Sequence, residues 1–332
     1  MNGFDEIIGH EEIKKHLTDA ISSKKVSHAY IFDGEDGCGK RMMATAFVKT
    51  LLCEKGGTSP CNECTSCKQM DSSNNPDVRW VTHAKPGIIS VDEIREQLVS
   101  DTLIKPYAAE RKVYIIDEAQ YLNVAAQNAM LKTIEEPPAY VTIIMLTNNS
   151  EMFLQTILSR CVTLKFKPVD NELVADYIIK QCHMPEYQAR LCAHFSGGNV
   201  GKALLLANGG EIAGIREEVL GILKYSDQMN ISELISAVKT SSKYKVTPYE
   251  YIDFFLMWYR DILMYKATMD PNRIMYKSEI NSIIDQSKII SYEGLERIIE
   301  ALEKAKKRLK ANVNFETTME LMFLVIKERG KE

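Results

Sequence analysis

The chain has 332 residues, and a single hydrophobic core stops growing at roughly 250 to 300 residues, so we expect two or three domains. Its 41 basic and 45 acidic residues leave a formal net charge of -4, which excludes a general basic surface for nucleic acid. The first residues lack an apolar signal segment and no apolar run reaches the ~20 residues of a membrane span, so we expect a cytoplasmic protein.

Short apolar runs alternate with helical patterns over residues 1–168, an order typical of a parallel β-sheet with crossover helices. Residues 113–116 are all apolar, as expected of a central strand covered on both faces. Ser90 and Glu93 have the spacing of a capping box. Pro137 and Pro138 end a helix because proline cannot donate into the helical ladder. We expect strands at residues 29–32, 77–81, 113–116 and 141–146, and helices at residues 41–52, 91–99 and 124–134.

A glycine-rich loop joins the first strand to its helix, as in phosphate-binding loops whose backbone amides cradle phosphates. The next residue is Arg41, where a nucleotide hydrolase carries Ser or Thr to ligate Mg²⁺. A guanidinium has donors only and cannot ligate a cation that requires oxygen. The sequence therefore predicts a nucleotide-binding fold that lacks part of the hydrolytic machinery. The loop residues expected to contact nucleotide are Gly34, Gly37, Gly39, Lys40 and Arg41.

Four cysteines, Cys53, Cys61, Cys64 and Cys67, lie within fifteen residues after the loop helix. In a long chain without a signal segment, such a cluster favours metal ligation over disulfides. Four thiolates suit tetrahedral Zn²⁺, and an iron–sulfur cluster also uses four cysteines. A site closed by four thiolates has no open position for catalysis, so we expect a structural role.

The buried strand at residues 113–116 ends at Asp117 and Glu118. In an active hydrolase, Asp117 would hold Mg²⁺ through water and Glu118 would polarise the attacking water. The alternative is that both carboxylates cap the next helix. Their position after a covered strand, downstream of a glycine-rich loop, favours the nucleotide site.

Beyond residue 168 the strand patterns almost vanish and helical periodicity continues to the end of the chain. A short helical unit is expected to about residue 207, followed by a linker at residues 208–210. Phe254, Trp258, Ile262 and Tyr265 have helical spacing, and a stripe of this kind is more often core packing than a ligand site.

Three segments, at residues 115–119, 128–138 and 157–161, resemble the AAA+ subunits of bacterial clamp loaders. The resemblance covers about the first 205 residues motif by motif. It implies three domains: a RecA-like AAA+ domain over residues 1–168 with a zinc knuckle at 53–67, a helical lid over 169–208, and an all-α helical collar over 209–332 that joins subunits into a ring. The zinc module of these subunits favours Zn²⁺ over iron–sulfur for the four cysteines.

Two branches of this family differ in chemistry: the ATP-hydrolysing tau/gamma type and the non-hydrolysing delta prime type. Arg41 departs from the motor pattern, and Gly201 stands where the motor type carries a sensor arginine in its lid. Losing a metal-holding hydroxyl and a charge-stabilising arginine removes two parts of an electrostatic mechanism. The resemblance therefore points to the delta prime type, with no ATPase or polymerase activity of its own, as an accessory subunit of a DNA-directed DNA polymerase holoenzyme.

The resemblance also assigns Arg160, in the segment Ser159-Arg160-Cys161, as an arginine finger acting in trans on the ATP of a neighbouring subunit. The alternative is a surface arginine in an ordinary ion pair. Implied partners are the tau/gamma and delta subunits, the sliding clamp and primed DNA. Thr147 or Asn148 matches a phosphate-sensing position, or only caps its strand. ADP or ATP could remain at the altered loop, or Arg41 could fold into the phosphate pocket.

Two other functions compete with this interpretation. An active tau/gamma-type motor is disfavoured by Arg41 and Gly201. A zinc-bearing DNA-binding adaptor would use the fold only as a scaffold, but the zinc segment carries only Lys55 and Lys68 as basic residues.

Overall fold

The computed structural model describes residues 3–83, 85–208, 219–224, 230–240, 248–276, 279–311 and 313–328. They belong to two compact units, Met1–Val174 with Gly198–Lys202, and Ala175–Gly197 with Ala203–Glu332. The prediction of a lid domain separate from the collar remains a prediction. Within the described ranges, no helix is long and apolar enough to cross a bilayer.

The first unit is built on a five-stranded parallel sheet in the order β2-β3-β4-β1-β5. The four predicted strands are confirmed, and a fifth was not predicted because it is short and only partly buried. Since all strands are parallel, their carboxyl ends meet at one edge of the sheet, where ligands bind in open α/β sheets. The strands are β1 (Ala29–Asp33), β2 (Val78–Val81), β3 (Lys112–Ile116), β4 (Val141–Thr147) and β5 (Val162–Lys165).

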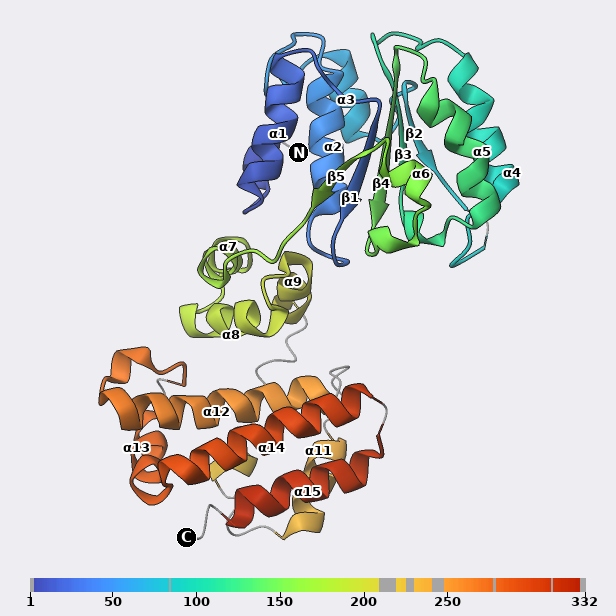
Figure 1. Ribbon diagram of the computed structural model, residues 1–332. Coiled ribbons are helices and arrows are strands. Elements are labelled where there is room, and N and C mark those ends of the chain that lie inside the picture. The colour runs from blue at the N-terminus through green and yellow to red at the C-terminus, as the bar shows by residue number, and fades with distance from the viewer. Residues whose placement is uncertain are drawn as a thin grey trace. The chain divides into compact units, whose positions relative to one another are not determined.

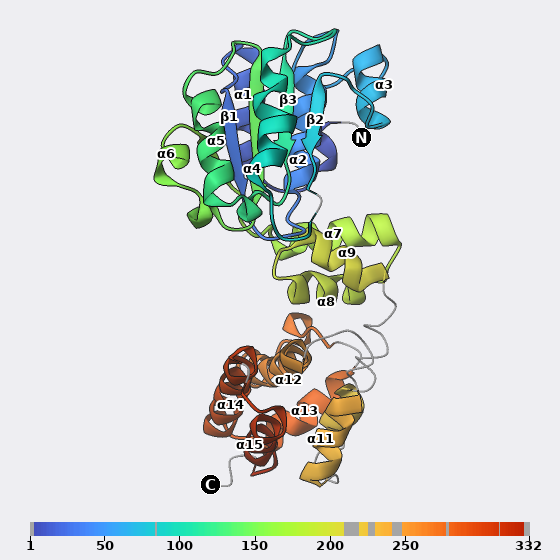
Figure 2. The same cartoon turned by 90° about the vertical axis from the view of Figure 1, so that its right-hand side faces the viewer.

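Helices cover both faces of this sheet (Figures 1 and 2). Successive side chains of β1 point to opposite faces, so Tyr30 and Phe32 join the core under α1 and α2, whereas Ala29 and Ile31 join the core under α4 and α5. The helices are α1 (Glu11–Ser22), α2 (Lys40–Leu51), α3 (Thr65–Asp71), α4 (Val91–Ile94), α5 (Val124–Glu135) and α6 (Gln155–Leu158). Single 3₁₀ turns lie at Phe4–Glu6, Asp101–Leu103, Ala119–Tyr121 and Ser150–Met152.

The predicted helices of this unit are confirmed with one local difference. The capping box at Ser90 is present, and its hydroxyl accepts from the Glu93 amide. The helix then changes to π-helical geometry over Arg95–Val99 instead of continuing as α-helix. Side-chain periodicity does not distinguish these geometries over five residues, so the sequence could not predict the change.

The second unit is helical throughout its described residues, as predicted. The predicted aromatic stripe is core: Phe254, Trp258 and Ile262 are buried, and the Trp258 indole donates to Gln286 at 2.9 Å. Two of the predicted linker residues, 209 and 210, lie outside the described residues. The helices are α7 (Asn171–Cys182), which begins in the first unit, α8 (Glu186–Ser196), α9 (Val200–Asn208), α11 (Ile231–Thr240), α12 (Pro248–Thr268), α13 (Ile280–Ile289), α14 (Tyr292–Lys310) and α15 (Phe315–Glu328), with a 3₁₀ turn at Pro271–Arg273.

Candidate functional site

The lysine of the glycine-rich loop is bound by the loop itself. Lys40, which is only 8% exposed, donates from Nζ to the carbonyl oxygens of Gly34 at 2.5 Å and Glu35 at 2.9 Å. Its third contact is the Asp36 carboxylate at 3.4 Å. A lysine ammonium has three N–H donors, so these three acceptors can use all of them. The lysine therefore has to exchange internal bonds before it can bind a phosphate.

The start of α9 closes on the same loop within the first unit. The Gly201 amide donates to the Gly37 carbonyl at 2.9 Å, and the Asn199 side-chain amide donates to the Asp36 carbonyl at 2.7 Å. A Cβ atom on residue 201 would lie 2.8 Å from both Cα and O of Gly37. Any side chain at position 201 would thus collide with the loop backbone. Glycine at this position permits the loop and the helix to touch.

Arg41 lies beside the first carboxylate after β3, outside the phosphate loop. Its guanidinium is 3.4 Å from the Asp117 carboxylate and stacks over the Trp80 ring at 4.6 Å. In a hydrolase, the residue at position 41 and Asp117 would share a hydrated Mg²⁺. In this chain the Arg41 guanidinium lies beside Asp117, where a hydrolase would hold the metal ion. The alternative in which Arg41 folds into the loop is not the arrangement seen.

Glu118 is paired with a histidine that the sequence analysis did not assign to the site. His83 Nε2 lies 3.1 Å from the Glu118 carboxylate, and Nδ1 lies 2.8 Å from the Lys85 carbonyl. Both partners only accept hydrogen bonds, so both ring nitrogens donate, which is the protonated form. The Lys85 carbonyl first and the Glu118 carboxylate second raise the pKa of His83. Glu118 is thereby paired with a basic side chain, although 53% of its own side chain remains exposed.

The polar end of β4 contacts the loop through the Asn148 side chain and the Thr147 backbone. The Thr147 carbonyl accepts from the Gly34 amide at 3.1 Å, whereas its hydroxyl is buried and bonds with the backbone of Asn149 at 3.1 Å. Asn148 donates to the Asp36 carboxylate at 3.2 Å. In this structure the Thr147 hydroxyl caps its strand and the Asn148 side chain contacts the phosphate loop.

Arg160 lies at the opposite edge of the sheet from the loop. It directly precedes β5, which runs parallel to β1, whereas the loop follows the carboxyl end of β1. The strand between the two sites spans more than about 10 Å. Arg160 forms an ion pair with the Glu135 carboxylate at 3.1 Å and donates to the Thr156 carbonyl at 2.9 Å and the Ser159 hydroxyl at 3.2 Å. It therefore cannot act at the loop of its own chain without a large rearrangement.

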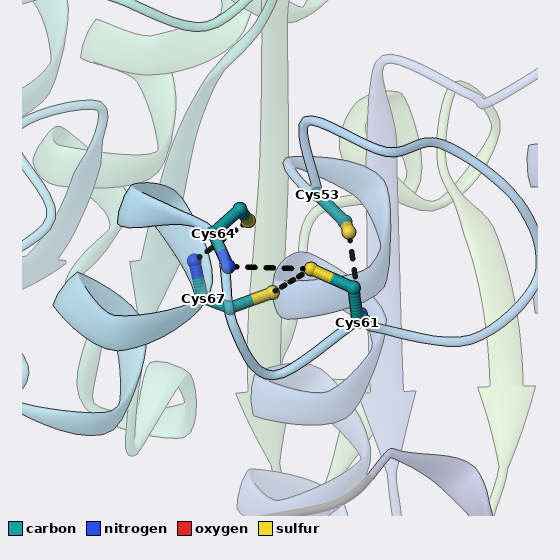
Figure 3. Close-up of side chains that lie close together, drawn as sticks. All are labelled: Cys53, Cys61, Cys64 and Cys67. Atoms are coloured by element: carbon teal, nitrogen blue, oxygen red, sulfur yellow. Dashed lines mark hydrogen bonds between the residues drawn. The ribbon is translucent and has the colours of Figure 1, made fainter.

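The four clustered cysteines meet as predicted and are all free thiols (Figure 3). Their sulfur atoms lie within 4.8 Å of one another, and those of Cys61 and Cys67 are 3.9 Å apart. Tetrahedral ligation with bonds of about 2.3 Å places sulfur atoms about 3.8 Å apart, so the cluster fits a metal ion. The amides of Cys61, Cys64 and Cys67 donate to cluster sulfurs at 3.3 to 3.4 Å, which stabilises thiolates.

An ion pair with a buried lysine joins α3, the helix that contains Cys67, to α2, the helix after the loop. Lys49 of α2 is 1% exposed and reaches both carboxylate oxygens of Asp71 in α3 at 2.7 Å. Because a buried ammonium is costly without a partner, this contact fixes α3 against α2. The cysteine module is thereby attached directly to the phosphate-loop helix.

Sequence reasoning named Asn148 beside Thr147 as a phosphate-sensing candidate, but it missed the contacts that His83, Asn148 and Asn199 make in this site. Their partners lie 35, 112 and 163 residues away in the chain, so no local pattern records them. One signal was available: His83 follows a strand of the same parallel sheet, as Asp117 does, and residues after neighbouring strands meet at the carboxyl edge. Asn199 lay beyond such reasoning because it comes from a helix that folds back onto the loop.

Comparison with known proteins gives consistent similarities. Residues 9–170 match the family model described as DNA polymerase III, delta subunit. The chain is 30% identical over 320 residues to DNA polymerase III subunit delta' of Bacillus subtilis, covering 95% of each protein. It is 29% identical over 330 residues to the tau subunit of the same organism, covering 92% of this chain and 58% of tau. A solved gamma subunit-related protein from Thermotoga maritima shows 18% identity and a TM-score of 0.41, covering 96% of this chain and 98% of that one.

Proposed function

This chain belongs to the DNA polymerase III delta' family and is a clamp-loader subunit; on that premise we propose that it does not hydrolyse ATP itself and acts on the ATP of a neighbour. In this proposal it works in a hetero-oligomeric ring with tau/gamma and delta subunits, which loads the sliding clamp on primed DNA. The observation that carries the proposal is the Arg41–Asp117 ion pair, which puts a guanidinium where a hydrolase holds its metal.

The rest of the loop supports the absence of hydrolysis in cis. Lys40 bonds to its own loop, and Glu118 is paired with His83. Gly201 has no charged side chain to offer to a phosphate. Its Cα lies against Gly37, which leaves no room for a charged side chain at this position. Phosphoryl transfer depends on positioned charges more than on covalent chemistry, so these changes together remove most of its basis. Nucleotide binding without turnover is compatible with the remaining loop amides.

Arg160 is the residue that we propose acts in trans. Its side chain is 39% exposed and lies on the edge of the sheet away from its own loop. An arginine finger supplied by a neighbour is worth about 10³ to 10⁵ in rate in characterised hydrolases. The alternative role, a surface ion pair, is present as the Glu135 contact, but such a pair is worth only about 0 to 1 kcal/mol and does not explain a semi-exposed arginine held by three acceptors.

The test is a loader reconstituted from tau/gamma, delta and this chain, with DNA-stimulated ATP turnover as the readout. We expect Arg160→Ala to lower turnover while assembly, followed by gel filtration, is unchanged. Arg190→Ala is the matched control, because Arg190 pairs with Glu186 within one helix and is comparably exposed at 47%. Turnover by the Arg160→Ala loader equal to that of the Arg190→Ala loader would refute the trans role.

We propose that the four-cysteine cluster holds a structural Zn²⁺. Four soft ligands at tetrahedral spacing match this ion. When bound, the ion would fix the loop that carries Cys53 and Cys61 against α3. With every ligand position supplied by the chain, the site has no position for a reacting group, so the ion would serve the fold and not the chemistry.

A further inference from the structure

Glu135 occupies a position that is unfavourable for a carboxylate in the helix alone. It is the last residue of α5 and is followed by Glu136, so two acidic residues stand at a helix C-terminus. Helix C-termini carry partial negative charge, which makes acidic side chains there unfavourable. The Arg160 guanidinium, 3.1 Å from Glu135, offsets this cost. The acid is therefore explained by the arginine and not by the helix.

The contacts of Arg160 leave part of the guanidinium free. Nη1 donates to Thr156 and Ser159, and Nη2 forms the ion pair with Glu135. A guanidinium has five N–H groups, so even with one Nη2 hydrogen directed to Glu135, one on Nε and one on Nη2 make no hydrogen bond with the described residues. Two N–H groups in a rigid fork are what a phosphate oxygen pair accepts. The acceptors on one side thus fix the guanidinium, and its remaining N–H groups face the exterior.

We propose that Glu135 is a positioning residue for the trans action of Arg160, an inference that rests on the proposed function. Glu135 holds the guanidinium in the orientation required at the neighbour's phosphates, so that its rotamer freedom is lost before the nucleotide arrives. An arginine side chain loses rotamer entropy when it is ordered, and prior ordering removes part of that cost from the transition state. The carboxylate itself does not touch the nucleotide.

The experiment uses the reconstituted loader and measures kcat and KM for ATP with primed DNA. Glu135→Ala is expected to lower kcat about fivefold with KM within about twofold, because positioning acts on the transition state more than on binding. Glu135→Gln keeps an oxygen acceptor, so its kcat should lie between that of Glu135→Ala and that of the parent chain. Glu136→Ala is the matched control, since Glu136 neighbours Glu135 at the same helix end and makes no ion pair within the described residues, and it should leave kcat unchanged.

The double variant Glu135→Ala/Arg160→Ala separates this inference from the proposed function. If Glu135 acts only through Arg160, the double variant equals Arg160→Ala alone. Loss of activity in Arg160→Ala with full kcat in Glu135→Ala would overturn the positioning role and leave the arginine finger intact. If the Arg160→Ala substitution leaves ATP turnover unchanged, the arginine-finger role is refuted, and with it this inference. A further loss in the double variant would show that Glu135 acts by another route, which also contradicts the proposal.

Discussion

At the residue scale, the nucleotide loop is altered by substitution of charge more than by loss of shape. Asp117 and Glu118 remain where a hydrolase has them, but each faces a basic side chain, Arg41 or His83. The glycines still build the turn, and Gly37 and Gly39 have positive φ values of 86° and 99° that glycine adopts without strain. The fold of the site is kept, but its two carboxylates form pairs with basic side chains of the same chain.

Arg41→Ser restores the hydroxyl that a metal ligand requires. We expect the variant to bind ADP with Mg²⁺ more tightly than the parent chain, because Asp117 is released from its cation. Hydrolysis should stay at background, since Glu118 remains paired and position 201 remains glycine. Fluorescent-ADP titration with and without Mg²⁺ checks the first statement and single-turnover ATPase the second. Equal ADP affinity with and without Mg²⁺ would argue against the metal-site interpretation.

The His83–Glu118 pair gives a pH dependence of defined sign. The pKa of His83 is raised in the folded chain, so the folded state binds the proton more tightly than the unfolded state. The pair's contribution to stability is therefore complete below the unfolded pKa of about 6.5 and is lost as pH rises through the raised value. NMR titration of the His83 ring should show this raised pKa. In the Glu118→Gln variant the pKa of His83 should be lower than in the parent chain, although the Lys85 carbonyl still stabilises the protonated ring.

The sequence sufficed for those residues of the site that lie in local patterns. Arg41 stands out against the loop spacing, and the four cysteines lie within fifteen residues. The orientation of side chains was not available from sequence. Thr147 and Asn148 are neighbours at the end of one strand, and only packing decides that Asn148 faces Asp36. Similarly, nothing local connects Arg160 with Glu135, because β4 and α6 lie between them in the chain.

At the scale of elements, two helices are attached to the phosphate-loop region by short contacts. The start of α9 rests on Gly37 through Gly201, and α3 is fixed to α2 through Lys49 and Asp71. Strands and helices of the sheet were predictable because their periodicity is regular. The exceptions were β5, a four-residue strand with one buried residue, and the π-helical turn after α4. Both depend on tertiary contacts that override weak local patterns.

Gly201→Ala tests the contact between α9 and the loop. The new Cβ would lie 2.8 Å from two backbone atoms of Gly37, so we expect a loss of about 1 to 3 kcal/mol in unfolding free energy, typical of overpacking. Gly221→Ala is the control, because it is also helical and has no atom within 4 Å of the new Cβ. It should be neutral or stabilising by up to about 1 kcal/mol. Urea unfolding of both variants gives the comparison, and equal stability of the two would contradict the close contact.

The cysteine module is expected to depend on its metal. Elemental analysis of untagged protein should find about one equivalent of zinc per chain. Cys61→Ser should lose the metal and lower the melting temperature, whereas Cys182→Ser should keep the metal, since that thiol lies outside the cluster and contacts Asn208. A chelator should destabilise the parent chain and leave Cys61→Ser unchanged. Less than half an equivalent of zinc in the parent protein would contradict the assignment.

At the scale of the whole molecule, the proposed function divides an ATPase mechanism between two subunits. The carboxylates at the carboxyl edge of the sheet pair with basic side chains of the same chain, and Arg160 lies at the amino edge. Under this proposal the chain contributes to hydrolysis only beside another subunit that supplies the nucleotide. The second unit, whose described residues form helices around one apolar core, provides the large buried surface that a stable helical domain requires.

ATP turnover by the purified chain alone tests this account most directly. The chain and the tau/gamma subunit are assayed separately under the same conditions with Mg²⁺ and primed DNA. The account predicts that this chain shows only background hydrolysis while tau/gamma turns over. Steady hydrolysis by this chain at a rate similar to that of tau/gamma, abolished by Lys40→Ala, would contradict it.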